Sequence, residues 1–241
     1  MRHVLRIGGS ERNAFLQNLV TNEVPTAPGS LVYAALLTPQ GKYLTDFFLQ
    51  ETGEAILLDA DAGQAATLAK RLGMYKLRAD VTLETTDISV GLGTGPMPET
   101  ALADPRHADL GWRNYGGPGD DTDFDAIRVR HCVPEAGIEL IPDNTYILEA
   151  GFERLNGVDF KKGCYVGQEV TARMKHKTEL RKGLTTVSVD GAAPVGTSIE
   201  AEGKAVGTLF TQSGGQAIAH LRFDRAGAAM TAGDAAVTYD G

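Results

Sequence analysis

The sequence has few cysteines, no long apolar run and no excess of positive charge. Its 241 residues include two cysteines, Cys132 and Cys164, which form no CxxC pair and no zinc-type set with the histidines. Two thiols cannot supply the four thiolates of an iron–sulfur cluster, so cluster chemistry would need ligands from a partner or cofactor. The net charge of −8 excludes the uniformly basic surface of a dedicated duplex-binding domain.

Several signatures of common enzyme classes are also missing. The motifs of elbow hydrolases, P-loop NTPases and Rossmann dehydrogenases do not occur. No run of about 18 apolar residues is present, and residues 1–7 contain no apolar leader. We therefore expect no membrane partner, no direct nucleic-acid binding, no metal site in the chain itself and, by default, a cytoplasmic location.

Apolar periodicity and turn residues predict an α+β fold. Residues 1–95 indicate the order β-α-β-β-β-α-β-β, with strands over 4–7, 31–37, 43–49, 55–58, 79–83 and 88–92 and helices over 11–20 and 61–72. Asp61 is the expected start of the second helix and Gly73 its expected end.

The remaining residues predict further elements and a change in composition towards the C-terminus. Residues 126–133 are typical of a strand and 144–155 of a helix. Short Thr- and Val-rich segments separated by turns then predict a small β-barrel, with strands over 184–189, 198–201, 205–211, 217–221 and 235–239. The expected domains are an N-terminal α+β module over 1–95, a middle α/β module over 96–181 and the barrel over 182–241.

Residues 161–177 contain a cysteine and several basic residues that could form a functional site. Val170 and Met174 are four residues apart, which predicts a helix from Gln168 onward. Cys164 then lies just before a helix N-terminus, where free N–H groups favour a thiolate. Cys164 is therefore a candidate reactive thiol, and a small buried hydrophobic residue is the alternative.

The same part of the chain is basic. Between residues 161 and 182 it has two acids and seven basic residues, which are Lys161, Lys162, Arg173, Lys175, Lys177, Arg181 and Lys182. This basic stretch is either a solvated surface or a site for an anionic ligand or partner.

Several segments together resemble one protein family. Residues 162–169 are similar to the K-G-C-Y-x-G-Q-E signature of the YgfZ family of folate-binding proteins. Further similarities to this family cover most of the chain: residues 15–22 to its F-L-Q-x-L-x-T-N helix, 38–42 to its P-Q-G-K turn, 75–78 to its Y-x-L-R element, and 206–207 and 219–222 to its barrel strands.

The resemblance implies a fold and a function. The fold would be T-protein-like folate-binding α+β modules followed by a small C-terminal β-barrel, with tetrahydrofolate or a one-carbon derivative in a central channel. The function would be maturation or repair of iron–sulfur enzymes, including tRNA-modifying ones. The partners would be folate and iron–sulfur proteins or their assembly machinery, and Cys164 would be the key residue. The family also has a mitochondrial counterpart in cluster assembly.

The sister group is the aminomethyltransferase of glycine cleavage, the T-protein. Its catalytic Asp lies in an I-x-D-D stretch, and the matching stretch here keeps only Asp46, displaced by a residue or so. Asp46 is a catalytic candidate, with a solvent-facing hairpin residue as the alternative. A folate-dependent aminomethyl or one-carbon transferase is thus a second hypothesis, and a module that stores folate or scaffolds a partner is a third.

Several residues are expected to contact folate through this resemblance. Glu135 stands where the T-protein has a Glu that contacts the pterin. A carboxylate can pair with the two donors of the amino-pyrimidine edge of a pterin. The guanidinium of Arg78 can pair with the glutamate carboxylates of folate. We expect the basic stretch to bind the anionic polyglutamate tail of the same ligand. The other expected contacts are Tyr75, Arg78, Lys162, Tyr165, Gln168 and Glu169.

Overall fold

The computed structural model of the chain contains two compact units. Unit 1 comprises Met1–Thr122 and Phe152–Ala172, and unit 2 comprises Asp123–Gly151 and Arg173–Gly241. The stretch 96–181, expected to be one middle module, is therefore divided between the two units. The residues that the structure describes are 1–176, 180–227 and 229–241.

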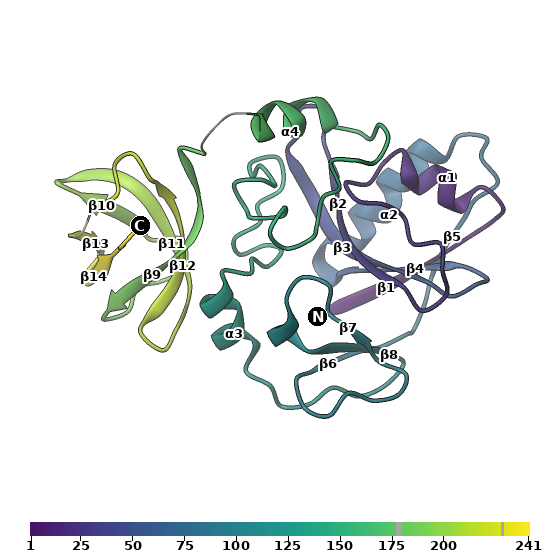
Figure 1. Cartoon of the computed structure of the whole chain (residues 1–241), viewed down its shortest axis with the longest axis horizontal. Coiled ribbons are helices and arrows are strands. Elements are labelled where there is room, and N and C mark those ends of the chain that lie inside the picture. Colours follow the sequence, from purple (N-terminus) through teal and green to yellow (C-terminus); the bar gives the residue numbers. More distant parts are fainter. Residues whose placement is uncertain (177–179, 228) are drawn as a thin grey trace. The chain divides into compact units, whose positions relative to one another are not determined.

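Unit 1 is built on a five-stranded antiparallel sheet with the order β2-β3-β4-β1-β5 (Figure 1). The elements in chain order are β1 (Arg2–Gly8), α1 (Arg12–Gln17), β2 (Leu31–Leu37), β3 (Tyr43–Glu51), β4 (Ile56–Asp61), α2 (Ala62–Lys76), β5 (Thr82–Thr85) and β6 (Val90–Gly93). This order confirms the predicted β-α-β-β-β-α-β-β. A separate three-stranded sheet joins β6 to β8 (Trp112–Tyr115) and β8 to β7 (Leu102–Ala103).

The start of α2 agrees with the prediction and its end does not. The Asp61 side chain accepts a hydrogen bond from the N–H of Gly63 and so caps the helix. The expected end at Gly73 is wrong, because the helix continues to Lys76 and stops at Leu77, whose φ of 47° leaves the helical region. A glycine inside a helix costs only about 1 kcal/mol and does not by itself end it.

One face of the five-stranded sheet forms an apolar core with both helices. Phe47 and Leu49 of β3 alternate with residues of the opposite face and lie on this face together with Leu58 of β4. Leu16 of α1 and Leu68 of α2 belong to the same buried cluster. Each such side chain contributes about 1.5–3 kcal/mol when fully buried, so this core fixes the positions of the strands.

The opposite face of the sheet carries aromatic and charged side chains. Tyr33, Phe48 and Asp59 are cross-strand neighbours on β2, β3 and β4. Arg113 of β8 covers Phe48 and Asp59: its Nη2 atom lies 3.0 Å from Asp59, and its guanidinium carbon lies 3.7 Å from the centre of the Phe48 ring. The second sheet therefore supplies a buried cation to this face of the first.

Two elements predicted between residues 123 and 155 are wrong. Residues 126–133 were expected to form a strand, but they contribute to helix α3 (Phe124–His131), which Asp123 caps by accepting from the N–H of Ala126. Residues 144–155 were expected to form a helix and instead form a series of turns. The backbone is left-handed at Gly151, with a φ of 77°, which a helix cannot accommodate.

The predicted C-terminal barrel is confirmed. Six strands close in the order β10-β11-β12-β9-β14-β13 (Figure 1). These strands are β9 (Lys182–Asp190), β10 (Ser198–Ala201), β11 (Lys204–Ser213), β12 (Gln216–Arg222), β13 (Met230–Ala232) and β14 (Ala235–Thr238). The sequence pattern missed β13, because it has only three residues. Among the described residues, no helix is long and apolar enough to span a membrane.

Candidate functional site

The candidate site is the cysteine segment, residues 161–167 of unit 1, which precedes helix α4 (Gln168–Lys175). This helix confirms the one expected from Gln168 onward. Lys162 fixes the beginning of the segment, because its Nζ atom donates to the carbonyl oxygens of Gln17 at 2.9 Å, Val20 at 2.6 Å and Asn22 at 2.8 Å. An ammonium group has three N–H bonds, so these three carbonyls use all of them.

Lys162 keeps its positive charge among the three backbone carbonyls. Its side chain is buried, and burial lowers the pKa to about 8, while Glu23 and Asp159 raise it. At pH 7 the ammonium form therefore still dominates, and this form has a donor for each carbonyl. Gln17 is the last residue of α1, where a cation also compensates the unpaired carbonyls of a helix end.

A second set of hydrogen bonds joins the same two parts of the chain. Thr21 is fully buried, and its hydroxyl donates to the carbonyl of Gly157 at 2.6 Å. The backbone N–H of Asp159 donates to the carbonyl of Thr21 at 3.0 Å. The Asn22 amide donates to the carbonyl of Asn156 at 2.7 Å. Residues 20–22, which end one of the family-like segments, thus hold the chain that leads into the other.

The end of the cysteine segment is fixed by a close backbone crossing. Gly167 has a φ of 85°, and a Cβ atom there would lie 2.6 Å from the carbonyl oxygen of Thr38. Gly41, in the turn between β2 and β3, has a φ of 75°, and a Cβ atom there would lie 2.8 Å from the Cβ of Val170. Both positions need glycine, because a side chain would be strained and would not fit.

The remaining residues of the signature lie near the backbone that Lys162 and Gly167 hold in place. Tyr165 is buried, its ring centre lies 5.4 Å from the Lys162 ammonium, and burial raises its pKa to about 12. The Gln168 side chain donates to the carbonyl of Gly163 at 3.4 Å, and Glu169 is exposed in the first turn of α4. These residues stay predicted folate contacts, although Lys162 has no N–H left for a ligand.

The thiol of Cys164 is presented to solvent. Of the two cysteines, Cys164 is exposed and Cys132 is buried, and neither forms a disulfide. Cys132 packs with Val129 and Ile218 in unit 2. The alternative that Cys164 is a small buried hydrophobic residue is therefore wrong. Lys162 and Gly167 hold the backbone on either side of an accessible thiol.

We expect Lys162→Met to lower the free energy of unfolding of unit 1 by about 3 kcal/mol, because three buried carbonyls lose charge-assisted hydrogen bonds. Lys162→Arg should not restore it, since a planar guanidinium cannot direct three donors to one point. Urea unfolding followed by the fluorescence of Trp112, the single tryptophan of the chain and a residue of unit 1, measures this change.

The matched control for this experiment is Lys161→Met at the exposed neighbouring position. It removes the same charge and should change the free energy of unfolding by less than about 0.5 kcal/mol. Equal effects of the two substitutions would contradict the structural role of Lys162.

Asp46 is buried rather than solvent-facing, so the hairpin alternative is wrong. Its carboxylate accepts from the Tyr33 hydroxyl at 3.0 Å and from the Tyr43 hydroxyl at 2.7 Å. Burial, and then the charge of Asp46, raises the pKa of both tyrosines well above the usual value. Each carboxylate oxygen thus has a phenol donor on the charged face of the sheet.

The other predicted folate contacts of unit 1 lie at the end of α2. Tyr75 is half-buried and lines a hollow of about 270 Å³ with Phe15 and Leu19, while Arg78 is exposed. No other predicted folate contact lines this hollow. The expected folate site therefore stays a prediction.

Glu135 belongs to unit 2, where its carboxylate is already paired. Arg128 Nη1 lies 2.8 Å from Glu135 Oε2, and Arg128 Nη2 lies 2.6 Å from Glu139 Oε2. The Glu139 side chain is buried, whereas that of Glu135 is 48% exposed. Arg128 therefore holds Glu135 while one side of its carboxylate faces solvent.

The basic stretch is divided between the two units. Lys162 is buried, and Lys177 lies outside the described residues. Its five other cations are exposed, and they are Lys161, Arg173, Lys175, Arg181 and Lys182. Lys161 is in unit 1 and the remaining four are in unit 2.

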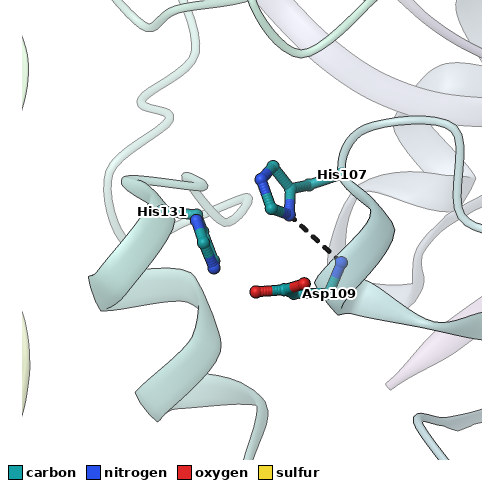
Figure 2. Close-up of side chains that lie close together, drawn as sticks. All are labelled: His107, Asp109 and His131. Carbon is teal, nitrogen blue, oxygen red and sulfur yellow. Dashed lines mark hydrogen bonds between the residues drawn. The ribbon is translucent and has the colours of Figure 1, made fainter.

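Two features of the structure could not be predicted from the sequence: a buried arginine and a helix cap formed by a histidine. Arg113, buried beside Asp59, could not be recognised from the sequence, because it looks like an ordinary exposed residue of a strand. The role of His107 was also not predicted: its Nδ1 accepts the backbone N–H of Asp109 at 3.1 Å and caps the 3₁₀ helix η1 (Ala108–Leu110), as Figure 2 shows. A histidine two residues before an Asp gives no distinctive pattern for such a cap.

Comparison with known proteins supports the predicted fold. Residues 181–240 match the family described as CAF17, C-terminal beta-barrel domain. The chain is similar to the crystal structure of glycine cleavage system aminomethyltransferase T from Bartonella henselae, with a TM-score of 0.76 and 13% identity, covering 98% of this chain and 81% of that one. The T-protein-like fold with a terminal β-barrel is thus confirmed.

The curated relatives correct the expected location. They include the iron–sulfur cluster assembly factor IBA57, mitochondrial, of mouse and of human. The prediction of a cytoplasmic protein is therefore wrong. It rested on the lack of an apolar leader, which detects secretory signals only, because mitochondrial transit peptides are amphipathic and Arg-rich.

The similarity to these relatives extends over most of each protein. The mouse protein is 31% identical over 270 aligned positions, which cover 92% of this chain and 75% of the relative. The human protein is 32% identical over 267 positions, which cover 91% and 75%. With the T-protein-like fold, the C-terminal barrel and this degree of identity, the chain belongs to the IBA57 family.

Proposed function

We propose that the chain acts in iron–sulfur cluster assembly and that Cys164 provides one thiolate ligand to a cluster in transit. The observation that carries this proposal is an exposed thiol on a backbone fixed on both sides, by Lys162 and by Gly167. The names of the mouse and human relatives support the same activity. An iron–sulfur cluster is here a cargo and not a resident cofactor.

The number of thiols determines how such a cargo would be held. A cluster takes four ligands, usually thiolates, and the chain has one exposed cysteine. The remaining ligands must therefore come from a partner that carries the cluster or from a small thiol. Cys164 would displace one ligand of the incoming cluster, and the proton of the thiol would pass to the departing ligand or to solvent.

The test is anaerobic reconstitution of the reduced full chain with ferrous iron, sulfide and glutathione. Under the proposal, the chain acquires the visible absorption and circular dichroism of a protein-bound [2Fe–2S] cluster. Gel filtration followed by iron and sulfide analysis measures how much cluster stays bound. A wild-type chain that leaves the column without iron would overturn the proposal.

Folate binding is a further proposal, supported by the T-protein-like fold and by the resemblance of residues 162–169 to the YgfZ signature. Assistance to iron–sulfur enzymes that modify tRNA rests on the same resemblance. Calorimetric titration of tetrahydrofolate into the wild type and into Glu135→Ala tests the folate premise. We expect binding that weakens about tenfold in the variant, because a charge-assisted pairing is lost.

The outcomes of the folate titration separate the two proposals. If no binding is detected at ~1 mM ligand, any binding free energy is weaker than about −4 kcal/mol. This result would refute the folate proposal and leave the cluster proposal unaffected. The alternative of an aminomethyl or one-carbon transferase has less support, because Asp46 is buried with a tyrosine hydroxyl on each carboxylate oxygen. A module with a merely structural Cys164 is not favoured either, since this thiol is exposed.

A further inference from the structure

The barrel of unit 2 has a cationic hollow on its outer surface. The hollow has a volume of about 480 Å³ and extends over neighbouring strands β11, β12 and β9. Among the described residues, its wall contains three side chains with permanent positive charge and no carboxylate, although the whole chain has a net charge of −8. The lining residues that carry donor groups are Arg181, Lys182, Thr208, His220 and Arg222.

The register of the strands forces the cations together. Lys182 of β9 and Arg222 of β12 are direct cross-strand partners in the antiparallel ladder. They point away from the barrel interior, because the neighbouring Leu221 belongs to its buried core. The backbone N–H of Phe223 donates to the carbonyl of Arg181, so the pairing continues to a third cation. Like charges directly opposite each other destabilise a sheet unless a counter-charge is present.

The nearby carboxylates compensate this charge only in part. Glu149 Oε2 lies 3.4 Å from Lys182 Nζ and 3.6 Å from His220 Nε2, at an adjoining hollow of about 120 Å³. Asp224 lies 3.4 Å from Arg222 and 4.0 Å from Arg225, and both arginines are about half exposed. Among the residues that the structure describes, positive charge therefore remains in excess at the larger hollow.

Hydrogen-bond donors complete the surface of the hollow. The Thr208 and His220 side chains stand side by side, since these residues are cross-strand partners on β11 and β12. Gly207 leaves part of the wall without a side chain, and a Cβ atom there would lie 2.4 Å from the carbonyl oxygen of His220. Guanidinium, ammonium and hydroxyl donors around one space are the groups that bind oxyanions.

We infer that this hollow binds a small molecule with two or more oxyanion groups, either carboxylates or phosphates. The inference is independent of the cluster proposal, because the hollow and Cys164 belong to different units. Its volume lies within the roughly 300–1,000 Å³ typical of small-molecule sites. Arg222 and Arg181 supply the main charge, and Thr208 and His220 supply hydrogen bonds.

The experiment is calorimetric titration of the full chain with inorganic pyrophosphate and, separately, with citrate, in buffer free of divalent cations. At least one of them should bind, and Arg222→Gln should weaken the binding about tenfold through loss of a charge-assisted contact. Arg181→Gln should have a similar effect. Pyrophosphate binding assigns a phosphate ligand, citrate binding a carboxylate ligand, and binding of both a site that accepts either group.

Lys204→Gln is the matched control, because Lys204 is an exposed cation of the same barrel that does not line the hollow. It should leave the affinity unchanged. Equal weakening by Lys204→Gln and Arg222→Gln would show diffuse attraction and overturn the site, as would a wild type that binds neither anion at ~1 mM. Circular dichroism of each variant verifies that the barrel remains folded.

Discussion

Cys164→Ser is expected to reduce the amount of cluster retained after anaerobic reconstitution by at least about tenfold. Serine keeps the size and polarity of cysteine, but its hydroxyl does not ionise near neutral pH and is a poor ligand for iron. Because Cys164 is the exposed thiol of the chain, no other cysteine replaces it. Iron and sulfide content after gel filtration, together with visible circular dichroism, measures the loss.

Cys132→Ser is the matched control for this experiment. It removes one thiol from the same chain, at a buried position packed against Val129 and Ile218. Cluster retention should remain close to that of the wild type. Loss of the cluster from the Cys132 variant alone, or equal retention by the two variants, would contradict a ligand role for Cys164.

Arg113→Met is expected to lower the free energy of unfolding of unit 1 by about 3 kcal/mol, the lower end of the usual effect of breaking a buried ion pair, because Asp59 keeps Arg2 and Asp104 keeps Arg106. Arg113 is 2% exposed and contacts Asp59 at 3.0 Å and Asp104 at 3.2 Å. Burial alone would raise the pKa of Asp104, but Arg106 and Arg113 outweigh it and hold that pKa at about 2. Methionine fills the space without compensating either carboxylate.

The unfolding of unit 1 can be followed without interference from the barrel. Trp112 is the single tryptophan, it lies in β8 beside Arg113, and it is buried. Urea titration of its fluorescence therefore reports unit 1. The control is Arg6→Met, which breaks an exposed pair with Glu84 and should change the free energy of unfolding by less than about 1 kcal/mol. Similar effects of the two substitutions would refute the importance of the buried cluster.

The sequence predicted the parts of the fold that depend on local pattern. The order of strands and helices over residues 1–95 follows from alternation and caps, as at Asp61, and five of the six barrel strands follow from turn spacing. Helix α3 was missed because apolar and polar residues alternate at Ile127, Arg128 and Val129, although the cap at Asp123 decides in favour of a helix.

The candidate site was predictable in its location but not in its construction. The signature singled out Cys164, yet no local pattern showed that Lys162 would bind carbonyls 140 to 145 positions earlier in the chain. The burial of Asp46 likewise depends on Tyr33, from another strand, and on the layer that covers this face of the sheet. Contacts between residues far apart in sequence leave no periodic signal, so composition and spacing cannot reveal them.

The discontinuity of unit 1 also sets an order of events during translation. The ribosome releases the five-stranded sheet before residues 123–151 of unit 2, and only then residues 152–172. Until that point the carbonyls of Gln17, Val20 and Asn22 lack the ammonium of Lys162, and closing so long a loop has an entropic cost. The anchored form of the cysteine segment therefore arises late in synthesis, so a nascent chain does not present the fixed thiol before the rest of unit 1 exists.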